Sequence, residues 1–342
     1  MSFNIGAKIK AKRLRLSMTQ EQLAGRLGVS AQAVSKWESG ANMPDIQLLP
    51  ELSVIFGVTI DSLFDIADES KLERIDNMLD DIRFLSDEEF HSTEQYLKDC
   101  AGKPNLAGEA TLLLAELYNK RADEYHELAS PLARKALELL PDSKAAHNAI
   151  FSAENGPYLD WNFINHHCLI DFYKQVVKSR PEDVHNYFWL LDLLIADGRT
   201  PEAREYVEQM KAVEDSYHYE MYMGMICRAE SDLPGALDWW KKMTEHYPEE
   251  WVVWATYADF MAKLCRYEEA IRYYKKAMPM RPKPRFTDCE EAVAHIYEIQ
   301  GNYAAAIEMN RQRLQVVLED WTTEGETVDA IHREIRRLEE RM

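Results

Sequence analysis

Four alanines recur at nearly equal intervals in the second half of the chain, which limits this part of the fold to stacked copies of one helical unit. The alanines are Ala203, Ala236, Ala270 and Ala306, at separations of 33, 34 and 36 residues. After the second and third of them, an aromatic residue follows four positions later, a small or apolar residue seven later and a proline twelve later. Small residues let the two antiparallel helices of a unit approach each other, aromatic residues fill the gap to the next unit, and proline ends the second helix. The spacing therefore predicts four pairs of antiparallel helices.

The first helix of each unit carries a complementary pattern, a small residue followed three positions later by a bulkier one. The pairs are Gly224 with Cys227, Ala258 with Met261, and Ala294 with Tyr297. The period and these residues resemble the tetratricopeptide repeat, which implies a superhelix whose concave groove is lined mainly by the first helices. Two degenerate copies are expected upstream, one from Ala115 to Pro141 and one from Ile150 to Pro181, so that repeats cover about residues 105 to 318.

A last helical pattern follows the repeats, with apolar residues at alternating steps of three and four. These residues are Val328, Ile331, Ile335, Leu338 and Met342. We expect a helix that caps the repeats. A dimer seam is the alternative, and its short length of about two heptads makes it the weaker interpretation.

The first 64 residues carry a different pattern, of short helices separated by turn residues. The first helix is basic and amphipathic, with apolar residues at Ile5, Ile9, Leu14 and Leu16. The second begins at Thr19, where the residues TQEQ have the capping-box pattern, and ends at Gly28. The third follows Ser30 as its N-cap and ends at Gly40. Two short helices joined by a turn that contains glycine are typical of a helix-turn-helix.

This region resembles the XRE family, the Cro and phage-repressor group. The matching residues are Thr19, Gln20, Leu23, Ala24, Leu27, Gly28, Val29, Ser30, Val34, Ser35, Trp37, Glu38 and Gly40, followed by Pro44, Leu48 and Leu52 to Phe56 for a fourth helix. The resemblance implies a five-helix bundle that binds operator DNA, with Arg13 and Glu38 as an internal ion pair between the first and third helices. A surface bridge that contributes little stability is the alternative for this pair.

In such a motif the N-terminal half of the third helix lies in the major groove. The candidates for base contact are therefore Ala31, Gln32, Ala33, Ser35 and Lys36. Gln32 can bond adenine through two hydrogen bonds and Lys36 can donate to guanine, each worth about 1–3 kcal/mol of discrimination. Gln20, at the start of the second helix, is expected to meet a phosphate, and Lys12 and Asn42 are further phosphate candidates.

The charge of the chain is divided unevenly. The net charge of -19 argues against nucleic acid, yet residues 1–64 hold seven basic and five acidic residues, a net of +2. Residues 65–342 hold 33 basic and 54 acidic residues, a net of -21. We therefore expect a small head that contacts phosphates and an acidic body that repels DNA, which confines contact to the head.

Catalytic and metal-binding signatures are missing from the sequence. It contains no GxSxG, no HExxH, no glycine-rich phosphate loop and no Cys/His metal spacing, so we expect no enzyme, no metal and no cofactor. The five cysteines are odd in number and never spaced as CxxC, which argues against a disulfide framework. The sequence also has no run of 18 apolar residues and no apolar block at its start, so we expect a cytoplasmic protein with no membrane partner.

The predicted fold class is all-α, because 13 glycines and 13 prolines are few for 342 residues. We expect a helix-turn-helix domain over residues 1–66, a helical connector over 67–104 and a repeat domain over 105–342. The connector has apolar residues at helical spacing: Leu72, Ile75, Leu79, Ile82 and Leu85. Since operators of such heads are two half-sites one helical turn apart, a homodimer is expected, and the connector is one candidate dimer surface. Packing of the connector on the chain's own repeats is the alternative.

The repeat frame also predicts which residues face the groove: His185, Asp192, His218, Met221, Arg228, Asp259, Lys263, Asp288, Glu291, His295 and Glu298. A helix-turn-helix head on a repeat body is similar to the peptide-pheromone receptors of Gram-positive bacteria, which implies a short peptide in the groove that alters the spacing of paired heads. Those receptors hold peptide backbones with groove asparagines, and the last four repeats here have none on that face. Asparagines upstream that could serve are Asn148, Asn162, Asn165 and Asn186. The competing hypothesis is a protein-docking or dimerisation scaffold with no small effector.

Overall fold

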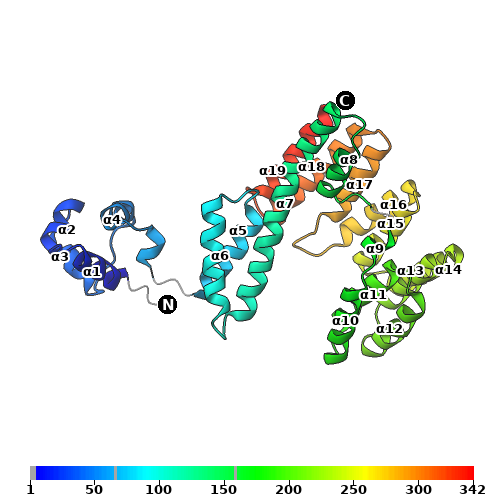
Figure 1. Cartoon of the computed structure of the whole chain (residues 1–342), viewed down its shortest axis with the longest axis horizontal. Coiled ribbons are helices and arrows are strands. Elements are labelled where there is room, and N and C mark those ends of the chain that lie inside the picture. The colour runs from blue at the N-terminus through cyan, green and yellow to red at the C-terminus, as the bar shows by residue number, and fades with distance from the viewer. Residues whose placement is uncertain (1–4, 65–67, 158–159) are drawn as a thin grey trace. The chain divides into compact units, whose positions relative to one another are not determined.

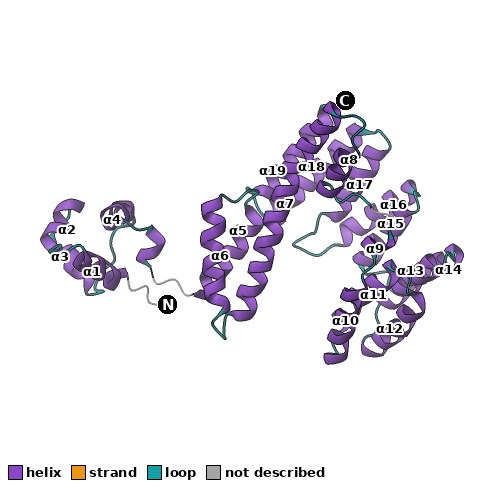
Figure 2. Cartoon of the chain, in the orientation of Figure 1, coloured by secondary structure: helices purple, strands orange, loops and turns teal. Residues whose placement is uncertain are grey.

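The computed structural model describes residues 5–64, 68–157 and 160–342, and the regular structure in these ranges is entirely helical (Figure 2). The expected all-α fold class is confirmed. No helix in the described ranges is both long and apolar enough to cross a membrane. The chain divides into two compact units, Met1–Tyr125 and His126–Met342 (Figure 1). The domain limits after residues 66 and 104 stay predictions.

The head, residues 5–64, has the order of elements that the sequence predicts. Its helices are α1 (Ile5–Arg15), α2 (Gln20–Leu27), α3 (Ala31–Glu38) and α4 (Leu49–Phe56), with the 3₁₀ turns η1 (Ile46–Leu48) and η2 (Ile60–Leu63). The fifth helix of the expected bundle is thus the single turn η2. One apolar cluster, which includes Ile9, Leu23, Val34 and Leu52, joins the four α-helices.

The inward face of α1 differs from the prediction. Leu14 and Leu16 are 56% and 43% exposed, whereas Ile5, Ile9 and Arg13 are buried. A helix repeats every 3.6 residues, so positions 5, 9 and 13 share one face and Leu14 falls on the opposite one, whereas Leu16 follows the end of the helix at Arg15.

Three helices, α5 (Asp68–Asp81), α6 (Asp87–Ala101) and the start of α7 (Ala107–Leu139), share one core in the first unit. Leu72, Ile75, Leu79 and Leu85 are buried in it against α6 and α7. Glu124 of α7 ties the group together, since its carboxylate accepts a hydrogen bond from the backbone N–H of Leu85 at 2.9 Å. The apolar face of the connector is therefore covered within the chain, and it is not the dimer surface considered above.

The first degenerate repeat is not formed. Residues 107–139, where the sequence pattern predicts a helix pair, are one continuous α-helix of 33 residues with Pro131 inside it. The stretch from Ala107 to Ser130 offers no proline and only Gly108, at the helix start, so neither of the two strongest helix-ending residues interrupts it. A proline at the end of a repeat is therefore weaker evidence for a helix pair than a turn residue between the two helices.

The second degenerate repeat also differs from the prediction. Its residues form α8 (Lys144–Ala153), α9 (Trp161–Ile164) and α10 (His167–Ser179). The end of α8 is held to α7, because Glu154 accepts from Arg134 at 2.6 and 2.8 Å and from Ser130 at 2.6 Å. α10 packs instead on α11, through a cluster that contains Ile170, Val177 and Leu191.

The four helix pairs predicted from the alanine spacing are present. They are α11 (Val184–Ala196) with α12 (Thr200–Val213), α13 (His218–Ala229) with α14 (Leu233–His246), α15 (Trp251–Lys263) with α16 (Tyr267–Ala277), and α17 (Asp288–Ile299) with α18 (Tyr303–Asp320). All four anchor alanines are fully buried. The turn η3 (Met278–Met280) follows α16.

The small positions allow the close approach that the pattern implies. A Cβ on Gly224 would lie 2.2 Å from Nε1 of Trp240, so the indole ring of α14 rests directly on the backbone of α13. The same ring stacks on Phe260 of the next pair, with centroids 4.0 Å apart and planes 13° apart. Trp240 thus links two neighbouring repeats.

The chain ends in α19 (Glu326–Glu339), which covers the last repeat. Val328, Ile331, Ile335 and Leu338 are buried against α18, in a cluster with Ala306 and others. This packing is what a cap on the last repeat requires, and of the five pattern residues Met342 alone is exposed.

Candidate functional site

The recognition helix α3 is fixed to α1 by a buried ion pair. Arg13 donates to both carboxylate oxygens of Glu38, at 2.6 and 2.8 Å, and to the backbone oxygen of Met18 at 2.7 Å. The two side chains are 8% and 3% exposed. Hydrogen bonding to Arg13 holds the pKa of Glu38 below its ordinary value, and the pKa of Arg13 is raised in turn. The ion pair that the resemblance implies is therefore present, and it is internal.

Both helices of the motif begin at side-chain caps, as predicted. Thr19 and Gln22 form a reciprocal capping box on α2, with N–H···O distances of 2.8 and 3.2 Å. Ser30 accepts from the N–H of Ala33 at 3.2 Å and starts α3. Between them Gly28 adopts a φ of 66°, a left-handed conformation that glycine adopts without strain. The turn is thereby set by its own residues, and it fixes the angle at which α3 leaves α2.

The candidate base-contacting side chains share the outward side of α3. Gln32, Ser35 and Lys36 are exposed and Ala31 and Ala33 are partly exposed, whereas Val34 and Trp37 point into the core. Lys12 is partly exposed and Asn42 is exposed. The arrangement leaves polar and methyl groups of α3 free to enter a groove.

Gln20 has a different environment from the one expected. Its amide nitrogen donates to Glu38 at 2.9 Å, so this side chain completes the ion-pair network in the structure without DNA. A phosphate at the start of α2 would then be met by backbone N–H groups of the first turn, with Gln20 holding Glu38 in place.

The projected groove residues separate into two groups. Those of the last repeat are held by neighbouring helices: Glu291 pairs with Arg313 at 2.7 Å, and Glu298 pairs with Arg337 of the cap at 2.6 Å. These two glutamates therefore stabilise the end of the repeats and are not open to a ligand in this structure. His295 and Asp288 are exposed.

Groove residues of the earlier repeats lie beside aromatic rings. His218 is stacked on Phe188 with centroids 4.2 Å apart, and its Nδ1 lies 3.0 Å from the hydroxyl of Ser216. Burial lowers the pKa of His218, so the ring is held in its neutral form near neutral pH. His185 is exposed and lies 3.1 Å from Asp183, and Met221 is partly buried against two core clusters.

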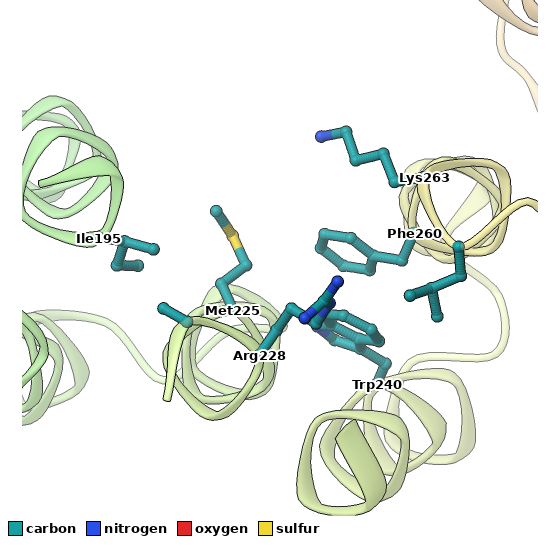
Figure 3. A pocket seen from close by; sticks show the side chains of 8 residues that line it. Ile195, Met225, Arg228, Trp240, Phe260 and Lys263 are labelled. Atoms are coloured by element: carbon teal, nitrogen blue, oxygen red, sulfur yellow. The ribbon is translucent and has the colours of Figure 1, made fainter. Parts of the chain in front are cut away.

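A cavity of about 390 Å³ lies where α11, α13 and α15 meet (Figure 3). Ile195, Met225, Trp240 and Phe260 give it an apolar lining, and Arg228 and Lys263 bring two cations to it. Arg228 and Lys263 are among the predicted groove residues. The apolar lining was missed, although Met225 lies three residues before Arg228 and Ile195 three after Asp192, on the same helix faces.

Two carboxylates lie near this cavity. Partial burial raises the pKa of Asp192, and the positive charge of Lys263 opposes this shift. Burial also raises the pKa of Asp259, which accepts a hydrogen bond from Tyr274 and is influenced by the same lysine. Lys263 therefore influences two acidic groups that come from different repeats.

Two of the upstream asparagines that could hold a peptide backbone instead bond to the chain's own backbone near the ends of helices. Asn165 donates to the backbone oxygen of Trp161 at 3.0 Å, and Asn186 donates to that of Arg180 at 3.3 Å.

Nδ1 of His166 lies 2.6 Å from a carboxylate oxygen of Asp197. The described residues contain no cluster of His, Cys, Asp or Glu suited to a metal ion.

Comparison with known proteins places the head in a family. A family model described as helix-turn-helix matches residues 9–63. The HTH-type transcriptional activator BcrR of Enterococcus faecalis is 48% identical over 63 residues, which are 18% of this chain and 30% of BcrR. An HTH-type transcriptional regulator of Archaeoglobus fulgidus is 35% identical over 65 residues, which are 19% of this chain and 90% of that protein. The chain thus spans less than half the length of the first curated relatives it matches, at 30% and 47%.

Solved structures with a similar succession of helices match this chain with low TM-scores. A tetratricopeptide repeat protein from Parabacteroides merdae is 14% identical, with 79% of this chain and 97% of that chain covered and a TM-score of 0.39. The structure of Bacillus thuringiensis PlcR in complex with the peptide PapR7 and DNA is 12% identical, with 98% of each chain covered and a TM-score of 0.28. Similarity at these scores has no bearing on function.

Proposed function

We propose a function from the premise that the chain belongs to the family of helix-turn-helix transcriptional regulators. The chain is a sequence-specific DNA-binding regulator that acts as a homodimer and reads operator half-sites through α3. Its activity is controlled by a peptide or protein bound to the helical repeats. The competing function is a scaffold, in which the repeats serve dimerisation or protein docking without a small effector.

The observation that carries the DNA-binding proposal is the geometry of α3. Gln32, Ser35 and Lys36 are exposed together, on a helix whose other side is fixed by the buried pair of Arg13 and Glu38. A rigid helix with donors and acceptors on one open face matches the hydrogen-bonding edges of bases in the major groove. Backbone N–H groups at the start of α2 add a phosphate contact.

The test is base preference. DNA selected by the full-length chain from a random pool defines the operator, and Gln32→Ala and Lys36→Ala are then measured by fluorescence anisotropy at fixed salt. Each variant should weaken operator binding by about 1–3 kcal/mol and relax the preference at one position of each half-site. Gln47→Ala, on η1, is the matched control and should leave preference unchanged. Unaltered affinity and preference in both α3 variants would refute their assignment.

Exposed leucines on α7 support the proposal of a homodimer. Leu128, Leu132 and Leu139 are 55%, 71% and 69% exposed and share one side of the helix, and Leu140, which follows the helix, is 60% exposed. Apolar side chains grouped in this way mark surfaces that contact another protein. Since a paired operator requires two heads, a second copy of the chain is the partner that the function itself calls for.

The cavity between α11, α13 and α15 supports the effector proposal. It combines an apolar lining with charged groups, as small-ligand sites do, and its size is within their usual range. Native mass spectrometry and thermal-shift measurements with peptides from culture supernatant test the proposal. If no peptide binds and pull-downs recover a protein partner, the scaffold is the function of the repeats.

A further inference from the structure

The cavity in Figure 3 is bounded by three successive repeats, so its shape depends on how they stack. Trp240 of one repeat and Phe260 of the next form a flat aromatic wall, with planes only 13° apart. Met225 and Ile195 lie on the other side of the space in the view of Figure 3. A flat wall opposite flexible aliphatic side chains accommodates one apolar side chain of varied shape.

Two cations at this cavity have no acidic partner. Among the residues that the structure describes, neither Arg228 nor Lys263 has a carboxylate oxygen within 4.0 Å. Both side chains belong to exposed residues, and Figure 3 shows the amine of Lys263 directed away from the ribbon of α15. Most other arginines of the repeats are paired, as Arg199, Arg204 and Arg281 are with Glu202, Glu230 and Glu290.

This lack of pairing is notable because the body carries 54 acidic residues against 33 basic ones. Acidic side chains are abundant enough to neutralise both cations, yet Asp192 and Asp259 influence Lys263 only from beyond ion-pair distance. Two cations left open beside an apolar space are complementary to a ligand with one anionic end and one apolar group.

We propose that this cavity binds the C-terminal residue of a peptide, with its apolar side chain against Trp240 and Phe260 and its terminal carboxylate on Arg228 and Lys263. The inference rests on the proposed function, in which the repeats bind a peptide, and it assigns the end of that peptide to one site. A C-terminal Leu, Ile, Met or Phe carries its carboxylate and its apolar side chain on the same Cα. An internal Asp or Glu has no apolar group so close to its charge.

Asp192 and Asp259 complete the recognition. Asp192 lies three residues before Ile195 on α11 and Asp259 four residues before Lys263 on α15, so both are on helix faces that line the cavity and their carboxylates suit the N–H groups of the residues that precede the C-terminus. They also repel a second anionic group beside the cavity. The site therefore selects a peptide with one terminal carboxylate and an uncharged residue before it.

The test uses two random heptapeptide libraries, one with a free C-terminal carboxylate and one with a C-terminal amide, on the full-length protein. Leu, Ile, Met or Phe should be enriched at the last position of the free-acid library only. For the best free-acid peptide, isothermal titration should show binding weakened about tenfold or more by amidation, and by Arg228→Gln with Lys263→Gln. Lys241→Gln, an exposed cation on α14 that does not line the cavity, is the matched control and should bind normally.

The outcomes separate the two proposals. If both libraries yield binders with equal affinity and no preference at the last position, the repeats bind peptides but not by the C-terminus, and this inference is wrong. If neither library yields a binder, the peptide function itself fails, and this inference with it. If dodecanoate raises the thermal midpoint in an Arg228- and Lys263-dependent manner and no peptide is selected, the cavity binds a fatty carboxylate and the peptide assignment is overturned.

Discussion

At the scale of single residues, the pair of Arg13 and Glu38 decides how α3 is presented. A surface bridge between these residues would contribute little, but both side chains are almost completely covered. Removing one partner of a buried pair leaves the other charged and unpaired, which costs several kcal/mol. Since Arg13 also holds the oxygen of Met18 just before α2, the pair joins three elements of the head. Its role is to position α3, and it is not among the residues proposed to contact bases.

The pair makes the stability of the head depend on pH in the acidic range. Hydrogen bonding to Arg13 lowers the pKa of Glu38 below its ordinary value of 4.5. A carboxyl with a lowered folded-state pKa contributes its full stabilisation above 4.5, and the contribution is lost as pH falls through the folded value. Hydrogen exchange of α1 and α3 amides in the full-length chain should therefore show unchanged protection near neutral pH and declining protection below about pH 4.5.

Glu38→Gln is the variant that checks this cause. It should reduce the unfolding free energy of the head by about 1–3 kcal/mol at neutral pH, because the hydrogen bonds from Arg13 lose their charged acceptor. The protection of its α1 and α3 amides against hydrogen exchange should also vary less with pH in the acidic range than that of the natural chain. Equal acid dependence in both proteins would show that other carboxylates are responsible.

At the scale of elements, the turns inside the four helix pairs repeat one backbone conformation. Gly198, Ser231, Cys265 and Gly301 have φ values of 70°, 66°, 56° and 72°, and they are spaced as the anchor alanines are. A Cβ on Gly198 or Gly301 would meet nothing within 4 Å, so the backbone conformation alone favours glycine there. Ser231 and Cys265 adopt the same conformation with a side chain present, which carries a cost of about 1–2 kcal/mol each.

Ser231→Gly should therefore stabilise the repeats. We expect the unfolding free energy of the repeat region to rise by about 1 kcal/mol, which is the relief of strain less the entropy that glycine loses on folding. Urea unfolding followed by circular dichroism measures it. The matched control is Gly198→Ser at the equivalent turn, which should destabilise by a similar amount. A lower midpoint for Ser231→Gly would show that the serine side chain has contacts that outweigh the strain.

The same elements explain which parts of the fold were predictable. Small residues such as Gly224 and Ala236 report directly on close packing, so the four regular pairs followed from their spacing. The upstream copies failed because alanines are also good helix formers, and a run without a turn residue continued as the single helix α7. The charged groove residues were predicted from the repeat period alone. The period cannot reveal that Glu298 forms an ion pair with Arg337, a residue 39 positions away.

At the scale of the whole molecule, the low net charge of the head and the need for two heads lead to the same prediction. Both predict that pairing of the heads controls DNA binding. On the proposed function, we expect a head with a net charge of +2 to bind DNA weakly by itself, since affinity for phosphates grows with the number of cations that contact them. Two linked heads bind a paired operator much more tightly, because the second contact becomes intramolecular. Whatever governs pairing, or the spacing of a pair, therefore governs DNA binding.

The exposed leucines of α7 allow this to be tested. Leu128→Asp with Leu132→Asp places charges on the proposed dimer surface without disturbing a buried side chain, since both residues are more than half exposed. Sedimentation velocity at micromolar concentration should show a dimer for the natural chain and a monomer for the variant. Affinity for a paired operator should fall at least about tenfold, while affinity for a single half-site stays the same. Ile299→Asp, equally exposed at 64% but on α17, should remain dimeric. A variant that stays dimeric would exclude α7 as the dimer surface, and a natural chain that is monomeric even on operator DNA would exclude the homodimer.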